Sequence, residues 1–256
     1  MGRHVLAASV VAGVALLSGI GASAEPLAAK ATKYDNVHIR VTDPAKATEW
    51  YVAHLGATSR PRGVAFEGAV ISFVRADTLK PSAGSAIDHI AIAFPDVQAR
   101  MRQLTAAGVK VTAAVTRHPN GFESGFIEDP WGTRIEILQD PQSLGFHHVH
   151  LAVADPEATL SWFHQMVGGE RVSKTGGLRF GSVTLLAEKS PDTAPSGDRA
   201  IMNIAFRVAD VHKAVAELKG KGVRVATEPT AAGQLWFAFL DAPSGVRFEL
   251  LLRPPE

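Results

Sequence analysis

The sequence predicts an α+β fold built from four copies of a β-α-β-β-β unit. Four segments repeat one pattern, in which an apolar strand leads through an aspartate into an amphipathic helix, and further strand-like runs follow each helix. The segments start at Asn36, His89, His148 and Asn203, and the third lies 112 residues after the first. Because internal repetition decides architecture before local propensity does, we expect four units of about 55 residues each.

The start of each predicted helix is marked by an aspartate. This residue lies seven positions after the start of every segment, at Asp43, Asp96, Asp155 and Asp210. A carboxylate at this place can cap the helix N-terminus, and the glycine that follows each helix suits a C-terminal cap. The bends "DPWG" and "DAPSG", at 129–132 and 241–245, carry Pro and Gly where tight turns between the later strands need them.

The first residues are typical of a secretory signal peptide rather than of a domain. Arg3 and His4 precede the apolar run "VLAASVVAGVALLSGI", and "ASA" at 22–24 forms a small-residue cleavage site. A retained membrane anchor is the alternative, for which the run is short. We expect residues 1–24 to be removed and the protein to be periplasmic or secreted. A linker near "DPQSLG" then separates two domains of two units each, 33–140 and 145–253.

Composition excludes several classes of function. The chain has 26 basic and 25 acidic residues and no cysteine. A nucleic-acid-binding protein needs a basic face, and thiolate chemistry needs cysteine. We therefore expect a small-molecule substrate as partner, no nucleic acid, no membrane after signal cleavage, and a monomer or homodimer.

Three of the repeated stretches, "IDHIAIAF", "FHHVHLAV" and "EDPWGTRIEIL", resemble the vicinal oxygen chelate superfamily. This superfamily includes glyoxalase I, bleomycin-resistance proteins and extradiol dioxygenases, and the resemblance covers 34–252. It implies two domains with curved mixed sheets and helices outside. It also implies metal ligands at the start of the first strand of a unit and at a glutamate on a last strand.

Two ligand arrangements follow from this resemblance. The strand starts are Asn36, His89, His148 and Asn203, and the last-strand carboxylates are Glu136 and Glu249. If the two units of one domain close on each other, as in the dioxygenases, each site lacks one histidine. If units pair across domains, as in glyoxalase-like members, one site is complete and the other has lost both imidazoles. We favour the second arrangement, whose two sets are His89/Glu136/His148 and Asn36/Asn203/Glu249.

Other residues are candidates for binding and catalysis around the complete set. His150 shares the strand face of His148 and is a candidate general base, with a cavity-lining polar group as the alternative. Arg134 shares the face of Glu136, and His118 lies in a polar hairpin; both are candidates for substrate binding. An ion pair for Arg134 and a solvated loop for His118 are the alternatives. A fourth ligand, expected at Leu185 by alignment, is missing.

The sequence thus predicts an exported metal-dependent enzyme of lyase or isomerase type. One divalent ion (Fe, Mn, Zn or Ni) would act as a Lewis acid on a small oxygenated molecule. One alternative is an extradiol-type dioxygenase, although Asn203 stands where that group places its second histidine. The other is a non-catalytic small-molecule-binding protein of the bleomycin-resistance kind.

Overall fold

The computed structural model of the chain describes Met1 and residues 28–31, 33–119, 121–173 and 175–253. The predicted signal peptide, 1–24, lies outside these residues apart from Met1. No helix in the described ranges has the length and apolar character needed to cross a membrane.

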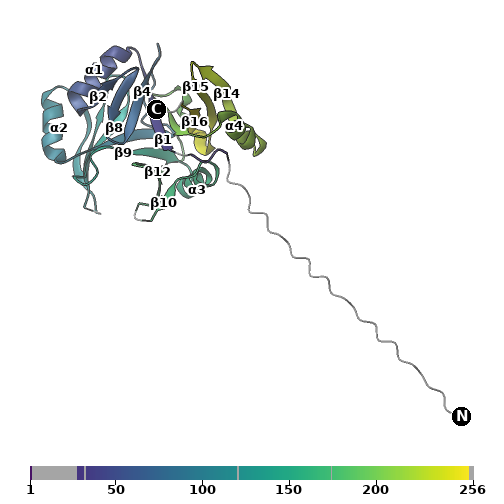
Figure 1. Ribbon diagram of the computed structural model, residues 1–256. Helices are drawn as coiled ribbons and strands as arrows, with labels where there is room; N and C mark the ends of the chain where they lie inside the picture. Colours follow the sequence, from purple (N-terminus) through teal and green to yellow (C-terminus); the bar gives the residue numbers. More distant parts are fainter. Residues whose placement is uncertain (2–27, 32, 120, 174, 254–256) are drawn as a thin grey trace.

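The fold is α+β, as predicted, and consists of four β-α-β-β-β units (Figure 1). The first unit contains β1 (Lys33–Val41), α1 (Pro44–Leu55), β2 (Thr58–Arg60), β3 (Gly63–Phe66) and β4 (Ala69–Arg75). The second contains β5 (Ile87–Phe94), α2 (Val97–Ala106), β6 (Lys110–Arg117), β7 (Glu123–Glu128) and β8 (Arg134–Gln139). The third contains β9 (Gly145–Val153), α3 (Pro156–Met166), β10 (Glu170–Val172), β11 (Gly177–Phe180) and β12 (Val183–Lys189). The fourth contains β13 (Ile201–Arg207), α4 (Val211–Gly220), β14 (Arg224–Ala232), β15 (Leu235–Asp241) and β16 (Arg247–Leu252).

The units pair across the two halves of the chain to form two mixed eight-stranded sheets. The second and third units form one sheet, in the order β10-β11-β12-β9-β5-β8-β7-β6. The first and fourth form the other, in the order β14-β15-β16-β13-β1-β4-β3-β2. We call them the histidine sheet and the asparagine sheet, after the strand starts His89 and His148 in one and Asn36 and Asn203 in the other. Their central pairs, β5–β9 and β1–β13, are antiparallel.

The helices lie at the periphery of the sheets (Figure 1), and each begins directly after its predicted aspartate, which is its N-cap. All four aspartate side chains accept hydrogen bonds from backbone N–H groups of the first helical turn, at 2.8–3.2 Å. The glycines after the helices have positive φ angles, for example 72° at Gly56 and 83° at Gly222. Glycine adopts this left-handed conformation without steric cost, so it lets the chain turn back toward the sheet.

Both sheets share one hydrophobic core. Phe163 on α3, which belongs to the histidine-sheet half, contacts Phe206 and Phe248 of the asparagine sheet, with ring centroids 6.3 and 5.8 Å apart. On the other side, the Tyr51 hydroxyl on α1 donates a buried hydrogen bond to Asp129, in the turn between β7 and β8, at 2.8 Å. These contacts hold the two sheets in one packed unit.

Candidate metal centre

The predicted ligands His89, Glu136 and His148 come together on the histidine sheet. Their strands are neighbours in the order β9-β5-β8, and Ala91 on β5 pairs with both His148 and Glu136. Since side chains alternate along a strand, His89, two residues before Ala91, shares their face. The Oε2 atom of Glu136 lies 3.2 Å from Nε2 of His148 and 3.7 Å from Nε2 of His89.

The donor atoms of this group fit a metal ion. Nε2 of His89 and Nε2 of His148 are buried and have no hydrogen-bond partner in the described part of the chain. A buried nitrogen without a partner is costly, and a cation shared with the carboxylate would satisfy both rings at once. Two imidazoles and one carboxylate also leave coordination positions open for a substrate.

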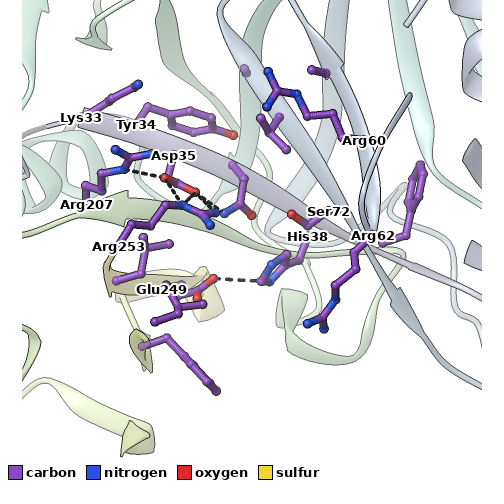
Figure 2. Close-up of a pocket in the computed structure, with 18 of the residues that line it drawn as sticks. Lys33, Tyr34, Asp35, His38, Arg60, Arg62, Ser72, Arg207, Glu249 and Arg253 are labelled. Carbon is purple, nitrogen blue, oxygen red and sulfur yellow. Dashed lines mark hydrogen bonds and ion pairs between the residues drawn. The ribbon is translucent and has the colours of Figure 1, made fainter. Parts of the chain in front are cut away.

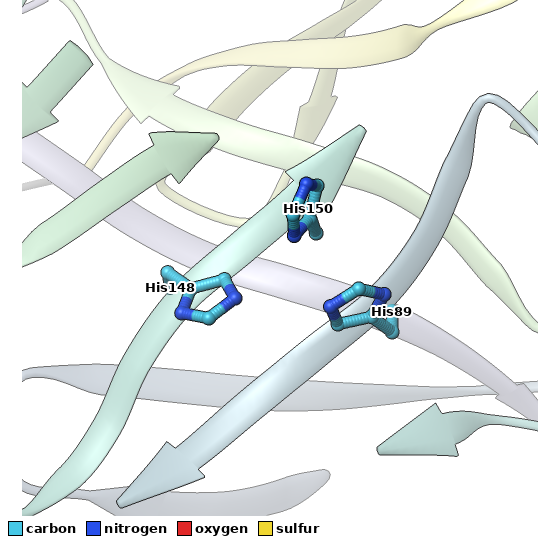
Figure 3. A group of neighbouring side chains, drawn as sticks. All are labelled: His89, His148 and His150. Atoms are coloured by element: carbon cyan, nitrogen blue, oxygen red, sulfur yellow. The ribbon is translucent and has the colours of Figure 1, made fainter. Parts of the chain in front are cut away.

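His150 brings a third imidazole to the same place (Figure 3). Its ring centroid lies 4.6 Å from that of His89 and 5.5 Å from that of His148. One ring nitrogen from each of the three histidines lies within 4.8 Å of the other two, so the group could hold a metal ion. Burial and the neighbouring imidazoles lower the pKa of His150 to about 3. A neutral ring of this kind can donate to a metal or accept a proton.

Electrostatics favours an ionised carboxylate beside a neutral imidazole. Burial raises the pKa of Glu136, but the His148 and His89 imidazoles outweigh it and hold that pKa well below its usual range. Burial is the main cause of the lowered pKa of His148. Burial also acts to lower the pKa of His89, but Asp88 and Glu136 raise it above its usual value.

Asp88 fixes the orientation of His89. Its Oδ1 lies 2.8 Å from Nδ1 of His89, and since a carboxylate only accepts, the ring must donate there and present Nε2 to Glu136. Asp88 in turn forms an ion pair with Arg134, whose guanidinium lies 3.9 Å above the ring of Phe126. Of the two roles considered for Arg134, the structure therefore contains the ion pair.

A second series of polar contacts orients His148. Nδ1 of His148 and Nδ1 of His147 are 2.9 Å apart, and Nε2 of His147 lies 3.4 Å from Asp140. The sequence analysis predicted neither the contacts of His147 and Asp140 nor the role of Asp88. The adjacent letters "DH" and "HH" were the available signal, but adjacency in a strand usually places side chains on opposite faces.

Two further expectations concern positions around the centre. The exposed His118 lies 2.9 Å from the Ser124 hydroxyl on β7, and its described contacts do not reach the three ligand candidates. The fourth-ligand position expected at Leu185 is wrong by one residue. Leu186 pairs with His150 as Ser72 pairs with His38, whereas Leu185 points into the core at 3% exposure. Leucine supplies no ligand at either position.

The corresponding groups of the asparagine sheet bond to one another instead. Nδ1 of His38 lies 3.1 Å from Oδ1 of Asn203, whose Nδ2 donates to Glu249 at 3.3 Å. Burial raises the pKa of Glu249 to about 8, so it is a neutral acid at neutral pH. Asn36, Asn203 and a protonated Glu249 do not fit a divalent transition metal. The sets expected within one domain do not assemble, because Asn36 and His89 lie in different sheets.

The chain belongs to the Glyoxalase/Bleomycin resistance protein/Dioxygenase superfamily, whose family model matches residues 33–137 and 145–250. This confirms the resemblance inferred from the repeated strands. Among solved structures, glyoxalase I from Zea mays is similar at 19% identity, covering 86% of this chain and 92% of its own, with a TM-score of 0.68. A putative dioxygenase from Bacillus subtilis is similar at 18% identity, covering 88% and 86%, with a TM-score of 0.67. At these identities the likeness shows the fold alone. A search of curated protein sequences finds no match.

Proposed function

We propose that the chain is an exported enzyme that holds one divalent metal ion on His89, Glu136 and His148 and acts on a small oxygenated molecule. The observation that carries this proposal is the convergence on one ionised carboxylate of two buried Nε2 atoms that make no hydrogen bond in the described part of the chain. Membership of a superfamily that includes glyoxalases and dioxygenases supports it. Export rests on the sequence of residues 1–24 alone.

When bound, the ion (Fe, Mn, Zn or Ni) supplies a Lewis acid for a substrate that chelates through two neighbouring oxygens, in a lyase or isomerase reaction. The residues of the chain prepare the site. Asp88 and the His147–Asp140 pair hold the two ligand rings with Nε2 toward Glu136. His150, the predicted general base, offers a neutral ring nitrogen to the substrate; its pKa of about 3 makes it a weak base that accepts a hydrogen bond more readily than it holds a proton. Arg134 is a positioning residue for Asp88, and a substrate contact for His118 stays a prediction.

Metal content tests the proposal directly. The protein is stripped with a chelator, reloaded separately with Fe(II), Mn(II), Zn(II) or Ni(II), and its bound metal is measured by mass spectrometry. We expect one ion per chain, and a fall in affinity of at least about 100-fold in His148→Ala and Glu136→Gln, because each loses a direct ligand. The control is His212→Gln, since His212 is exposed on α4 away from the centre.

Two results would refute the metal assignment. One is a wild-type protein that retains no divalent ion under any loading condition. The other is a His148→Ala variant that binds metal as tightly as His212→Gln does. The first result would favour the non-catalytic binding protein weighed above.

A further inference from the structure

A cavity of about 910 Å³ lies on the asparagine sheet, on residues that the proposed function does not use (Figure 2). It is lined by side chains from β1, the β2–β3 turn, β4, β15 and β16. Its volume lies within the range of about 300–1,000 Å³ that small-molecule sites occupy.

Positive charge in this cavity exceeds negative charge. Among the described lining residues, Asp35 is the carboxylate that is ionised at neutral pH, and it already forms ion pairs with both Arg207 and Arg253 (Figure 2). Three more lining cations, Lys33, Arg60 and Arg62, form no ion pair with any described residue. A partly enclosed surface with unbalanced positive charge attracts an anion.

Two buried polar atoms in the wall have no partner. Tyr34 and Asn36 are among the lining residues and are 4% and 1% exposed, and neither the Tyr34 hydroxyl nor Oδ1 of Asn36 has a hydrogen bond in the described part of the chain. Buried polar groups in native proteins are nearly always hydrogen-bonded. The wall therefore has unused hydrogen-bonding capacity directly behind its surface.

Arg62 stands at a backbone position that disfavours its side chain. It follows Pro61 in the two-residue turn between β2 and β3 and has a φ of 65°, where glycine or asparagine is usual. A non-glycine residue in this conformation costs free energy, and such residues cluster at binding sites. Arginine at the rim of a cationic cavity fits that pattern.

Besides the polar residues His38, Ser72 and Glu249, the wall contains an apolar and aromatic part. Phe66, Phe73, Phe237 and Phe239 line the cavity together with Leu251. Aromatic rings pack well against a flat apolar body, and arginines bind carboxylates through paired N–H donors. The wall therefore matches a ligand that is apolar at one end and anionic at the other.

We propose that this cavity is a second, metal-free binding site that takes an organic carboxylate with an aromatic or apolar body. The carboxylate lies toward Arg60 and Arg62, and the body packs against the phenylalanines. The site is independent of the histidine sheet and goes beyond the proposed metal-dependent activity.

Calorimetric titration of the full mature chain with naphthalene-2-carboxylate and with its neutral counterpart, naphthalene-2-carboxamide, tests the site. We expect the carboxylate to bind at least about tenfold more tightly than the amide, since only it can form charge-assisted hydrogen bonds. Arg62→Gly removes the charge and suits the positive φ, so it should keep thermal stability while weakening the carboxylate at least about fivefold and leaving the amide unchanged. Arg62→Lys keeps the charge but not the paired donors, so its carboxylate affinity should lie between those of the wild type and Arg62→Gly.

Two controls separate this site from the metal centre and from general charge. Carboxylate affinity should be unchanged in His148→Ala, and also in Arg102→Gln, because Arg102 is an exposed arginine on α2 outside the cavity. The proposal is overturned if the carboxylate does not bind, if the amide binds equally well, if Arg62→Gly binds like the wild type, or if His148→Ala abolishes binding. The titration measures carboxylate binding and requires no metal, so its result can be interpreted even if the metal assignment is wrong.

Discussion

Asp88 and Asp35 occupy the same place in the two sheets, one residue before His89 and Asn36, yet they have different partners. Asp88 accepts from His89 Nδ1 and pairs with Arg134. Asp35 accepts from Asn36 Nδ2 at 2.7 Å and pairs with two arginines. The first carboxylate directs a ring toward Glu136, whereas the second holds an amide and draws cations to the cavity wall.

Replacing Asp88 by asparagine should weaken metal binding without abolishing it. The variant keeps the three proposed ligands but loses the carboxylate that fixes the ring of His89, so we expect affinity to fall about 10- to 100-fold with the stoichiometry still one ion per chain. Competition with a fluorescent chelator measures the affinity. Asp35→Asn is the matched control and should bind metal like the wild type; equal affinity in both variants would contradict the positioning role of Asp88.

At the scale of elements, the sequence predicted helix starts well and strand faces less well. The four aspartates were found because a cap needs only its own backbone and that of the next turn, which are local in sequence. The fourth-ligand position was placed at Leu185 instead of Leu186, and a shift of one residue along a strand moves a side chain to the opposite face of the sheet. The position of Arg62 at the cavity was not predicted, because the sequence of the β2–β3 turn does not indicate that β1 and β16 lie nearby.

Removing one of these caps should destabilise the protein by a predictable amount. The Asp210 side chain accepts from the Lys213 N–H at 2.9 Å at the start of α4. Asp210→Ala leaves that donor without its partner, so we expect the free energy of unfolding to fall by about 1 kcal/mol, measured by urea denaturation. Asp77→Ala is the control, since Asp77 is exposed in a loop; a loss of equal size there would show that the cap is not the cause.

At the scale of the molecule, the two tyrosines offer a test of how the sheets are joined. Both are buried, at 0% and 4% exposure for Tyr51 and Tyr34, but among the described residues only the Tyr51 hydroxyl has a hydrogen-bond partner, Asp129. Burial raises the pKa of Asp129 to about 6, so at neutral pH this carboxylate is mostly ionised and depends on its donors.

Tyr51→Phe removes one donor from Asp129, and we expect the free energy of unfolding at pH 7 to fall by about 1.5–3 kcal/mol, as for hydrogen bonds to charged groups. Thermal and urea unfolding should remain a single transition, because both sheets share one core. Tyr34→Phe is the matched variant and should be neutral or stabilising. If the two variants lose equal stability, the hydrogen bond to Asp129 does not join the sheets as described.

The order of the strands shows how much of the arrangement followed from the repeats. The four units, their order and their aspartates were predicted from the sequence. The distribution of histidine and asparagine over the strand starts also favoured pairing of units across the two halves of the chain. What the sequence did not contain is the register that pairs His150 with His89, in a short regular stretch between two irregularities of the β5–β9 pairing. Such irregularities arise from packing between strands distant in sequence.

The joining of four units in one polypeptide has a consequence for how such a protein can change. In a symmetric dimer of two-unit chains, every substitution appears twice and alters both sites together. In this chain the two sheets consist of different residues, so a substitution that removes a histidine from one sheet leaves the other sheet unchanged. The two sites can therefore evolve separately, so that one keeps its metal-binding residues while the other changes to bind a different small molecule.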